Sequence, residues 1–331
     1  MRIDIQPIID NIYAAVKSHE LVPGRYARYL WQDEQGTRKM GVNEYGCADA
    51  ANILYTIGAF PGDEATRRAF VEAMQAMQDP DTGLFFEGTH HTYHTTAHVT
   101  AALELFDALP LYPMKGLEPF ETPEGITELL EGLEWDETPW GQSHKGAGVF
   151  AALAIIGRLR PETEDAYFEW LASHCDREHG LGVKMNTWGD STAHQLFGWF
   201  HYLFNHAFKK RPIPCADTLI DTCISLYDDR ELDDDFGRMC NFREIDWVFS
   251  LARAMRETPH RFDVGKDRLT RFAREYTDFL LQVDAARDDS FNDLHMLFGA
   301  VCALAELQQA LPGLLWSKKP LRLVLDRRPF I

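Results

Sequence analysis

The feature that most constrains this chain is a position, repeated six times, at which an apolar stretch begins. Successive occurrences are roughly 50 residues apart, which is about the length of one helical hairpin with its loops. These ring positions are held by Asp49, His98, Ala147, His194, Asp246 and His295. Such a repeat predicts an array of equivalent hairpins that directs a ring of Asp and His side chains toward a common place.

Two kinds of helical segment alternate along the chain. Segments with apolar residues at i, i+3, i+4 and i+7 and charges between them are expected to be outer helices with one solvated side. They cover roughly residues 4–19, 63–78, 123–134, 162–176, 214–228 and 266–283. The stretches after the ring positions are richer in Ala, Leu and Phe, so we expect inner helices that are packed on both sides.

Six such hairpins predict an all-α fold, and we expect one (α/α)6 toroid domain over residues 1–331. A linear solenoid is the competing architecture, but the sequence shows no polar capping repeat at either end. The approximate hairpin limits are 4–58, 63–109, 123–159, 162–207, 214–257 and 266–311.

Two segments depart from the helical pattern. Residues 26–41 (YARYLWQDEQGTRKMG) have the pattern of two short strands around a turn, and the tail 320–331 (PLRLVLDRRPFI) alternates like a strand after a proline. We expect a small β insertion near 26–41 that pairs with the extended tail over one end of the barrel. The tail is alternatively an exchanged arm in a homodimer.

Composition excludes several functional classes. A net charge of −18 is unfavourable for binding nucleic acid, which requires a basic face. No apolar run approaches the ~20 residues that span a bilayer, and the acidic N-terminus lacks the basic start of a signal peptide. The six cysteines form no CxxC pair, so we expect free thiols. We therefore predict a soluble, cytoplasmic protein that does not act at a membrane.

One turn carries a resemblance to known families. The string MQDPDTGLF (77–85) precedes an inner helix, and HCDREHGLG (174–182) is a degraded copy of it. The first string resembles the Gln-Asp-x-x-Gly-x-Phe turn of the prenyltransferase and terpenoid-cyclase toroids, whose barrel the six-hairpin glycosidases share. The resemblance implies an α/α-toroid fold. It implies no function, because the Asp-x-x-Tyr-Cys zinc string is missing and the acidic string 231–234 lies in a turn and not on the fifth inner helix.

Aromatic and amide side chains recur close to the ring positions. Sugar rings stack on aromatic surfaces, with carboxyl groups among them for proton transfer, although the same tryptophans can simply wedge neighbouring hairpins apart. The predicted substrate-binding residues are Tyr45, Tyr93, His94, Trp140, Trp188, Asn241, Asn292 and Asp293.

The histidine-rich string GTHHTYHTTAH (88–98) raises the question of a metal. His94 and His98 share a helix face, but an HxxxH pair without a neighbouring acidic ligand is a weak signal. Histidines of this kind often cap helix ends or hydrogen-bond loops. From the sequence we therefore predict no tightly bound metal, and the chain shows no signature of a nucleotide, flavin or pyridoxal cofactor.

These residues favour a carbohydrate-active enzyme that binds a small molecule or an oligosaccharide. A hydrolase is expected first, with Asp190 and either Asp49 or Asp246 as its acid and base and the histidines orienting hydroxyl groups. A polysaccharide lyase or sugar epimerase would instead pair a histidine with Tyr45 or Tyr93. The predicted catalytic residues are Asp190, Asp49, Asp246, His194, His98 and His295.

Two further classes remain open. An isoprenoid-type toroid enzyme would line its lumen with aromatic side chains. A non-catalytic binding module would keep the ring as a buried hydrogen-bond network. Carboxylates such as Asp190 and Asp49 also favour helix N-termini for purely electrostatic reasons. The aromatic candidates for an isoprenoid lumen are Phe85, Phe86, Phe197, Trp199, Phe200 and Trp247.

Overall fold

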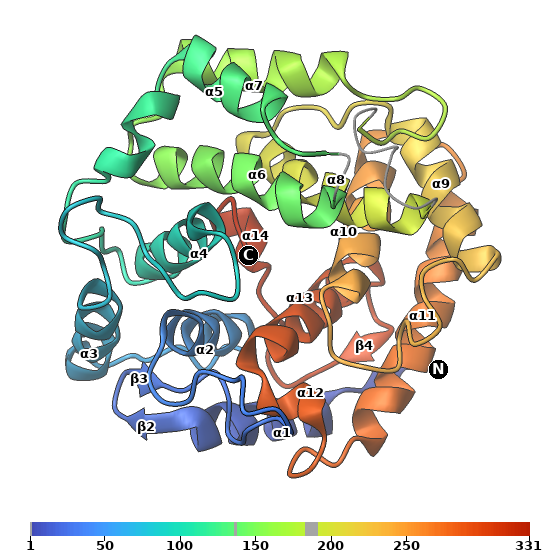
Figure 1. Ribbon diagram of the computed structural model, residues 1–331. Helices are drawn as coiled ribbons and strands as arrows, with labels where there is room; N and C mark the ends of the chain where they lie inside the picture. The colour runs from blue at the N-terminus through green and yellow to red at the C-terminus, as the bar shows by residue number, and fades with distance from the viewer. Residues whose placement is uncertain (1, 136–137, 183–190) are drawn as a thin grey trace.

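The computed structural model describes residues 2–135, 138–182 and 191–331, and these are predominantly helical (Figure 1). The all-α prediction is confirmed at this level. The outer helices are α1 (Gln6–His19), α3 (Glu64–Gln75), α5 (Pro123–Glu131), α7 (Pro161–Ser173), α9 (Ala216–Asp228) and α11 (Phe262–Gln282). The inner helices are α2 (Glu44–Thr56), α4 (Thr92–Glu104), α6 (Pro139–Ile155), α8 (Thr192–Lys209), α10 (Arg243–Glu257) and α13 (Leu294–Ala310).

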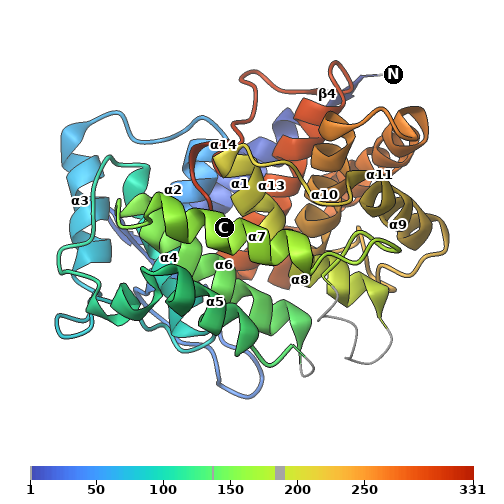
Figure 2. The ribbon, with the colours of Figure 1, turned by 90° about the horizontal axis from the view of Figure 1, so that it is seen from above.

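The inner helices contact one another in chain order. Helix α2 packs on α4, α4 on α6, α6 on α8, α8 on α10 and α10 on α13, and α13 returns to α2. Figure 1 shows these helices around the centre and the outer helices outside them, and Figure 2 shows α5 and α7 alongside α6. Most residues of α13 are buried, whereas α3 buries one face only, which matches the predicted division into inner and outer helices.

Polar side chains set where the inner helices begin. The Asn43 side chain accepts a hydrogen bond from the Gly46 amide at the start of α2, and the Asp293 side chain accepts one from the His295 amide at the start of α13. Thr138 caps α6 in the same way. Each cap satisfies an amide that lacks a partner within the helix. Each cap thereby fixes the residue at which its helix begins, and with it the helical positions of the residues that follow.

The two turns with related sequences fold alike. The Asp79 amide donates to the Leu84 carbonyl, and the Gly83 amide donates to the Asp79 carbonyl. Asp176 and Gly180 form the corresponding pair of bonds in the second turn, where the Asp176 amide donates to the carbonyl of residue 181. Both glycines have positive φ, of 75° and 70°, a conformation that other residues rarely adopt. The second string is therefore a structural copy of the first.

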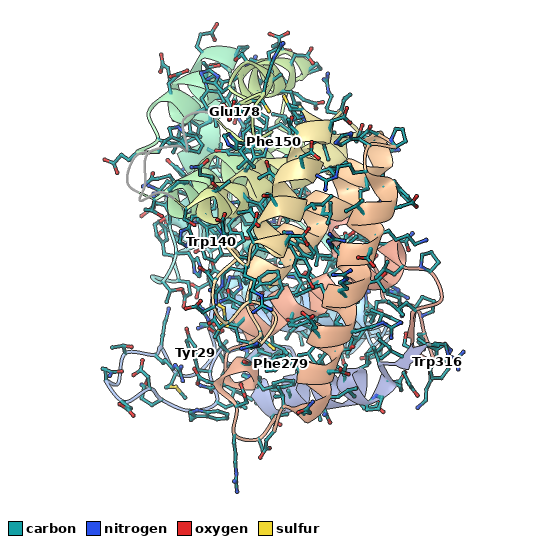
Figure 3. The ribbon with its side chains drawn as sticks, turned by 90° about the vertical axis from the view of Figure 1, so that its right-hand side faces the viewer. Tyr29, Trp140, Phe150, Glu178, Phe279 and Trp316 are labelled. Carbon is teal, nitrogen blue, oxygen red and sulfur yellow. The ribbon has the colours of Figure 1, made fainter. Side chains whose placement is uncertain are left out.

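Close approach between neighbouring segments depends on glycine at two inner-helix positions. A Cβ atom on Gly148 of α6 would lie 2.8 Å from the Tyr93 carbonyl oxygen, and one on Gly299 of α13 would lie 2.7 Å from that of Asn241. Both separations are too short for a side chain. These glycines let α6 and α13 approach the segments that carry residues of the cavity described below. Figure 3 shows how densely side chains fill the packed helices, with Phe150 inside and Trp316 at the surface.

The β prediction is wrong in its details. Among the described residues, β2 (Glu20–Val22) pairs with β3 (Arg25–Tyr26), and β1 (Ile3–Asp4) pairs with β4 (Leu315–Trp316). Residues 27–43 are largely irregular and are held by isolated bridges, including one between Tyr29 and Asp293.

The C-terminal tail is not a strand. It forms the short helix α14 (Val324–Arg327) and then runs in among the inner helices, where Phe330 and Ile331 are buried (Figure 1). Phe330 contacts the rings of His94 in α4 and Phe204 in α8. The tail packs within its own chain, and a homodimer stays a prediction. Within the described residues, no helix is both long and apolar enough to cross a membrane.

Candidate functional site

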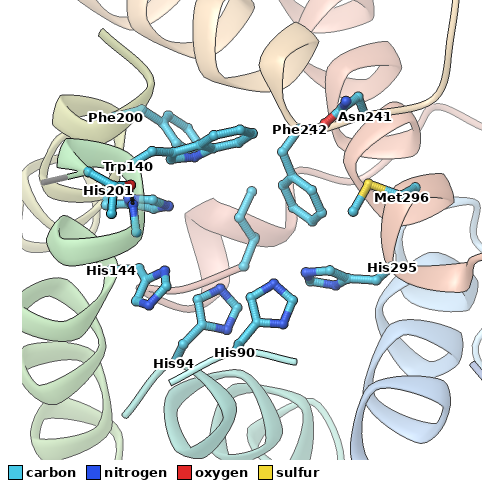
Figure 4. A pocket seen from close by; sticks show the side chains of 13 residues that line it. His90, His94, Trp140, His144, Phe200, His201, Asn241, Phe242, His295 and Met296 are labelled. Carbon is cyan, nitrogen blue, oxygen red and sulfur yellow. Dashed lines mark hydrogen bonds between the residues drawn. The ribbon is translucent and has the colours of Figure 1, made fainter. Parts of the chain in front are cut away.

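A cavity of about 340 Å³ lies between the inner helices and the loops that precede them (Figure 4). Figure 4 shows His144, His94, His90 and His295 along one side and Trp140, Phe200 and Phe242 across from them. Of the described residues, the lining contains no carboxylate, Lys or Arg side chain. It consists of His90, His94, Thr138, Trp140, Gly141, His144, Phe200, His201, Asn241, Phe242, His295, Met296 and Ile331.

Three of the predicted ring residues meet behind this cavity. His98 Nε2 lies 2.7 Å from Asp49 Oδ1, and His295 Nδ1 lies 3.2 Å from Asp49 Oδ2. All three residues are buried. Burial has the largest influence on Asp49 and favours its neutral form, but the two imidazoles outweigh it and hold the pKa of Asp49 below its usual range. Burial lowers the pKa of His98 to about 4. An ionised Asp49 therefore accepts an N–H from each of the two rings.

Tyr45 pairs with His94 at the edge of the cavity. The Tyr45 hydroxyl lies 2.6 Å from His94 Nδ1 and 3.4 Å from the Thr95 hydroxyl. Its ring stacks on those of His90 and His98, with centroids 4.9 and 5.1 Å away. For a lyase or epimerase, the sequence predicted a pair made of His194 or His98 with Tyr45 or Tyr93. In the structure His98 bonds Asp49, and His94, one helical turn earlier, bonds the tyrosine.

A buried network of charged side chains is connected to His90 through the Thr89 hydroxyl. Arg28 donates two hydrogen bonds to Asp293, at 2.8 and 2.9 Å, and a third to the Thr89 hydroxyl at 2.8 Å. That hydroxyl donates to the buried Glu87 and lies 2.9 Å from His90 Nδ1. Because the single Thr89 hydroxyl proton goes to Glu87, His90 must use its Nδ1–H to donate to Thr89. His90 Nε2 therefore carries the lone pair.

A similar argument sets the tautomer of His201 on the opposite wall. The Ser143 hydroxyl lies 3.0 Å from the Trp140 carbonyl oxygen, which can only accept, and 2.8 Å from His201 Nδ1. Both bonds form only if Ser143 donates to the carbonyl and accepts from His201 Nδ1–H. Burial lowers the pKa of His201 to about 3, so the ring is neutral. Its Nε2 lone pair has no hydrogen bond among the described residues.

Other predicted catalytic residues lie away from the cavity lining. Asp246 is fully buried, and neither of its carboxyl oxygens has a hydrogen-bond partner among the described residues. Burial and the nearby Glu244 raise its pKa well above the usual range, so Asp246 is a neutral acid inside the protein. His194 is half-buried in the first turn of α8, and Tyr93 packs edge-on against Phe120.

Two predicted substrate-binding residues have structural contacts instead. Asn292 accepts hydrogen bonds from the amides of Leu30 and Trp31, which holds the loop that replaces the predicted β insertion. Asp293 is bonded to Arg28 as described above and caps α13. Neither residue is in the cavity lining, and their oxygens accept from backbone and guanidinium donors. Trp140, Asn241, His94 and His295 line the cavity, and a role in binding substrate stays a prediction for all of these residues.

Sequence analysis missed His144, His201 and Phe242. A signal existed for two of them. Tyr45 and His94 each precede their ring position by four residues, Phe242 by four and His144 by three. A second ring, one helical turn before the first, therefore contributes much of the cavity. His201, seven residues after His194, has no counterpart in the repeat.

Asp190 and Trp188 lie outside the described residues, so their predicted roles stay predictions. Comparison with protein-family models, with curated proteins and with solved structures finds no match to this chain.

Proposed function

We propose that the alternating helices form an (α/α)6 toroid whose lumen holds the active site of an enzyme. The unbroken succession of inner-helix contacts, with α13 returning to α2, supports a closed ring over an open solenoid. The cavity at one place in that ring, lined by aromatic and imidazole groups, is of the size that takes a small organic substrate.

We infer that this enzyme transfers a proton on a small carbohydrate, as a lyase or an epimerase does. The observation that carries the proposal is the neutral His201 in the cavity lining, whose Nδ1–H donates to Ser143 and whose Nε2 has no hydrogen bond among the described residues. A histidine held in one tautomer by a second group is the usual arrangement of a general base. Trp140, Phe200 and Phe242 supply surfaces on which a sugar ring can stack, and Asn241 can hydrogen-bond a hydroxyl group.

The proposed step begins when His201 Nε2 takes the proton from a carbon next to a carbonyl or carboxyl group. The electron pair of the broken C–H bond moves into an enolate. In an epimerase, a proton returns to the opposite face of that carbon. In a lyase, the pair expels the oxygen substituent on the next carbon, which leaves with a proton, and a C=C bond remains. A carboxylate in the cavity would raise the pKa of His201 toward neutrality and make it a stronger base.

The hydrolase alternative requires two carboxyl groups on either side of a substrate. Asp49 is hydrogen-bonded to two imidazoles, and Asp246 is absent from the cavity lining. The third predicted catalytic carboxylate, Asp190, lies outside the described residues. The isoprenoid alternative is also weakened, because Phe200 is the one member of its six proposed aromatic residues that lines the cavity.

The test is a screen of uronate-containing oligosaccharides and keto sugars in deuterated water. Exchange of the carbon-bound hydrogen is followed by NMR, and C=C formation by ultraviolet absorbance. We expect His201→Gln to lose at least 100-fold in turnover and Ser143→Ala to lose less. The matched control is His206→Gln, a buried histidine on the same helix that does not line the cavity. Normal exchange by the folded His201→Gln variant would contradict the proposal.

A further inference from the structure

Three of the histidines that line the cavity come close enough to share a ligand. One ring nitrogen each from His90, His94 and His295 lies within 4.8 Å of the others. They come from two places in the chain, the start of α4 and the start of α13, and Figure 4 shows them side by side along one wall. Nitrogens that bind one zinc ion at about 2.1 Å are about 3.3 Å apart, so small ring rotations would complete such a site.

Each of the three rings has its Nδ1 next to an oxygen. His90 Nδ1 donates to Thr89, whose own proton is committed to Glu87. His295 Nδ1 lies 3.2 Å from Asp49 Oδ2, to which it donates a hydrogen bond. For these two rings the hydrogen bonds place the lone pair on Nε2.

The third ring is compatible with the same tautomer. His94 Nδ1 can donate to the Tyr45 oxygen while the Tyr45 hydroxyl proton points to Thr95. None of the three Nε2 atoms has a hydrogen-bond partner in the described part of the chain. With Nδ1 as the donor, each of the three rings can offer the lone pair of Nε2 to a cation.

We propose that His90, His94 and His295 bind one divalent transition-metal ion of the zinc type through Nε2. Neutral imidazoles suit zinc, cobalt and nickel, and three protein ligands leave a coordination position open, as in catalytic sites. The oxygen partners Thr89, Tyr45 and Asp49 are the outer groups that orient metal-binding histidines. The expectation of no metal rested on spacing along the chain, which does not show that His295 joins the histidine string.

A second grouping, Asp49 with His98 and His295, is geometrically close as well. It is a poorer site, because its carboxylate already accepts from both rings and neither Asp49 nor His98 lines the cavity. In the three-histidine site Asp49 is not a ligand. It accepts the hydrogen bond that orients His295.

This inference deepens the proposed function and rests on it for the role of the ion. Proton removal by His201 would generate an enolate. The described lining has no Arg or Lys side chain that could neutralise this enolate or a substrate carboxylate. An ion held by the three histidines would bind that oxygen and make the adjacent C–H bond more acidic. The substrate class is then a uronate or keto sugar that offers an oxygen to the metal and its acidic carbon to His201.

The experiment titrates Zn²⁺ and Co²⁺ into tag-free protein stripped with a chelator, with no substrate present. We expect about one equivalent to bind and cobalt to give visible absorption bands of low coordination number. His90→Asn and His94→Asn should each weaken binding by at least 100-fold, and Tyr45→Phe and Asp49→Asn by 10- to 100-fold. His174→Gln and His179→Gln, which replace histidines outside the cavity, are the controls and should bind as the parent does.

Outcomes for the metal and for the reaction are separable. His201→Gln should bind zinc like the parent, because it is not a ligand, but should lose turnover. Binding weaker than millimolar in the parent, or unchanged affinity in folded His90→Asn and His94→Asn, would overturn the metal site whatever the activity. Zinc binding by these histidines with no hydrogen exchange on any substrate would sustain the metal site and count against the proposed reaction alone.

Discussion

Glu244, at the start of α10, makes the stability of this protein depend on pH in a direction opposite to that of most carboxylates. The residue is fully buried, and one oxygen accepts a hydrogen bond from the Gly237 amide at 3.0 Å. The other oxygen has no partner among the described residues. Burial raises the pKa of Glu244 from 4.5 to about 7, against smaller opposing effects of the Gly237 amide and Arg243.

The sign and size of the effect follow from that pKa. Below pH 4.5 both folded and unfolded states are protonated, so Glu244 contributes nothing to the pH dependence. Between pH 4.5 and about 7 the unfolded state releases its proton while the folded state retains it, so the free energy of unfolding falls as pH rises. Each tenfold change in proton affinity is equivalent to about 1.4 kcal/mol. Above pH 7 the free energy of unfolding is therefore lower by about 3 kcal/mol than below pH 4.5. Asp246, whose pKa is also raised, acts in the same direction.

Glu244→Gln removes this titration and keeps an oxygen for the Gly237 amide. We expect urea unfolding, followed by far-ultraviolet circular dichroism, to show the variant gaining about 3 kcal/mol on the parent between pH 4.5 and pH 8. Glu231→Gln replaces an exposed carboxylate nearby and should leave the pH profile of the parent unchanged. Parallel profiles for the parent and Glu244→Gln would refute the argument that Glu244 is held as a buried neutral acid.

Three further outcomes are expected. Arg28→Met should lower the free energy of unfolding by about 3–5 kcal/mol, because it leaves Glu87 and Asp293 buried without a cation, and denaturant titration measures this. Gly148→Ala should cost about 1–3 kcal/mol by the same assay, since its Cβ would meet a backbone oxygen at 2.8 Å, and an unchanged melting temperature would contradict the close approach. Thr138→Ala should cost about 1 kcal/mol through loss of the α6 cap, with no change in the zinc affinity measured by titration.

Much of the helical architecture could be predicted because it is periodic in the sequence. The expected outer segments agree with α1, α3, α5, α7, α9 and α11 to within a few residues. Amphipathic spacing and capping residues act over one or two helical turns, so they are visible without knowledge of the fold. The repeat also identified Asp49, His98 and His295, which the structure brings together.

Local patterns failed where long-range contacts decide the outcome. The tail 320–331 alternates like a strand, but it forms a short helix, and its last residues are buried against α4 and α8. Asp246 occupies a ring position, but its carboxyl group is enclosed by protein and stays neutral.

The sequence by itself determined that the chain makes alternating outer and inner helices, with Asp and His near the starts of the inner ones. Only the tertiary structure decided which of these side chains share a site. His90 and His94 lie about 200 residues from His295 along the chain, and their rings meet because α13 closes against α2 and places its first turn beside α4. Hydrogen bonds from Nδ1 of His90 to Thr89 and from Nδ1 of His295 to Asp49 then set which nitrogen these two rings present. Helix spacing acts locally, whereas the packing of α13 on α2 and the tautomer of His295 depend on partners that are distant in sequence.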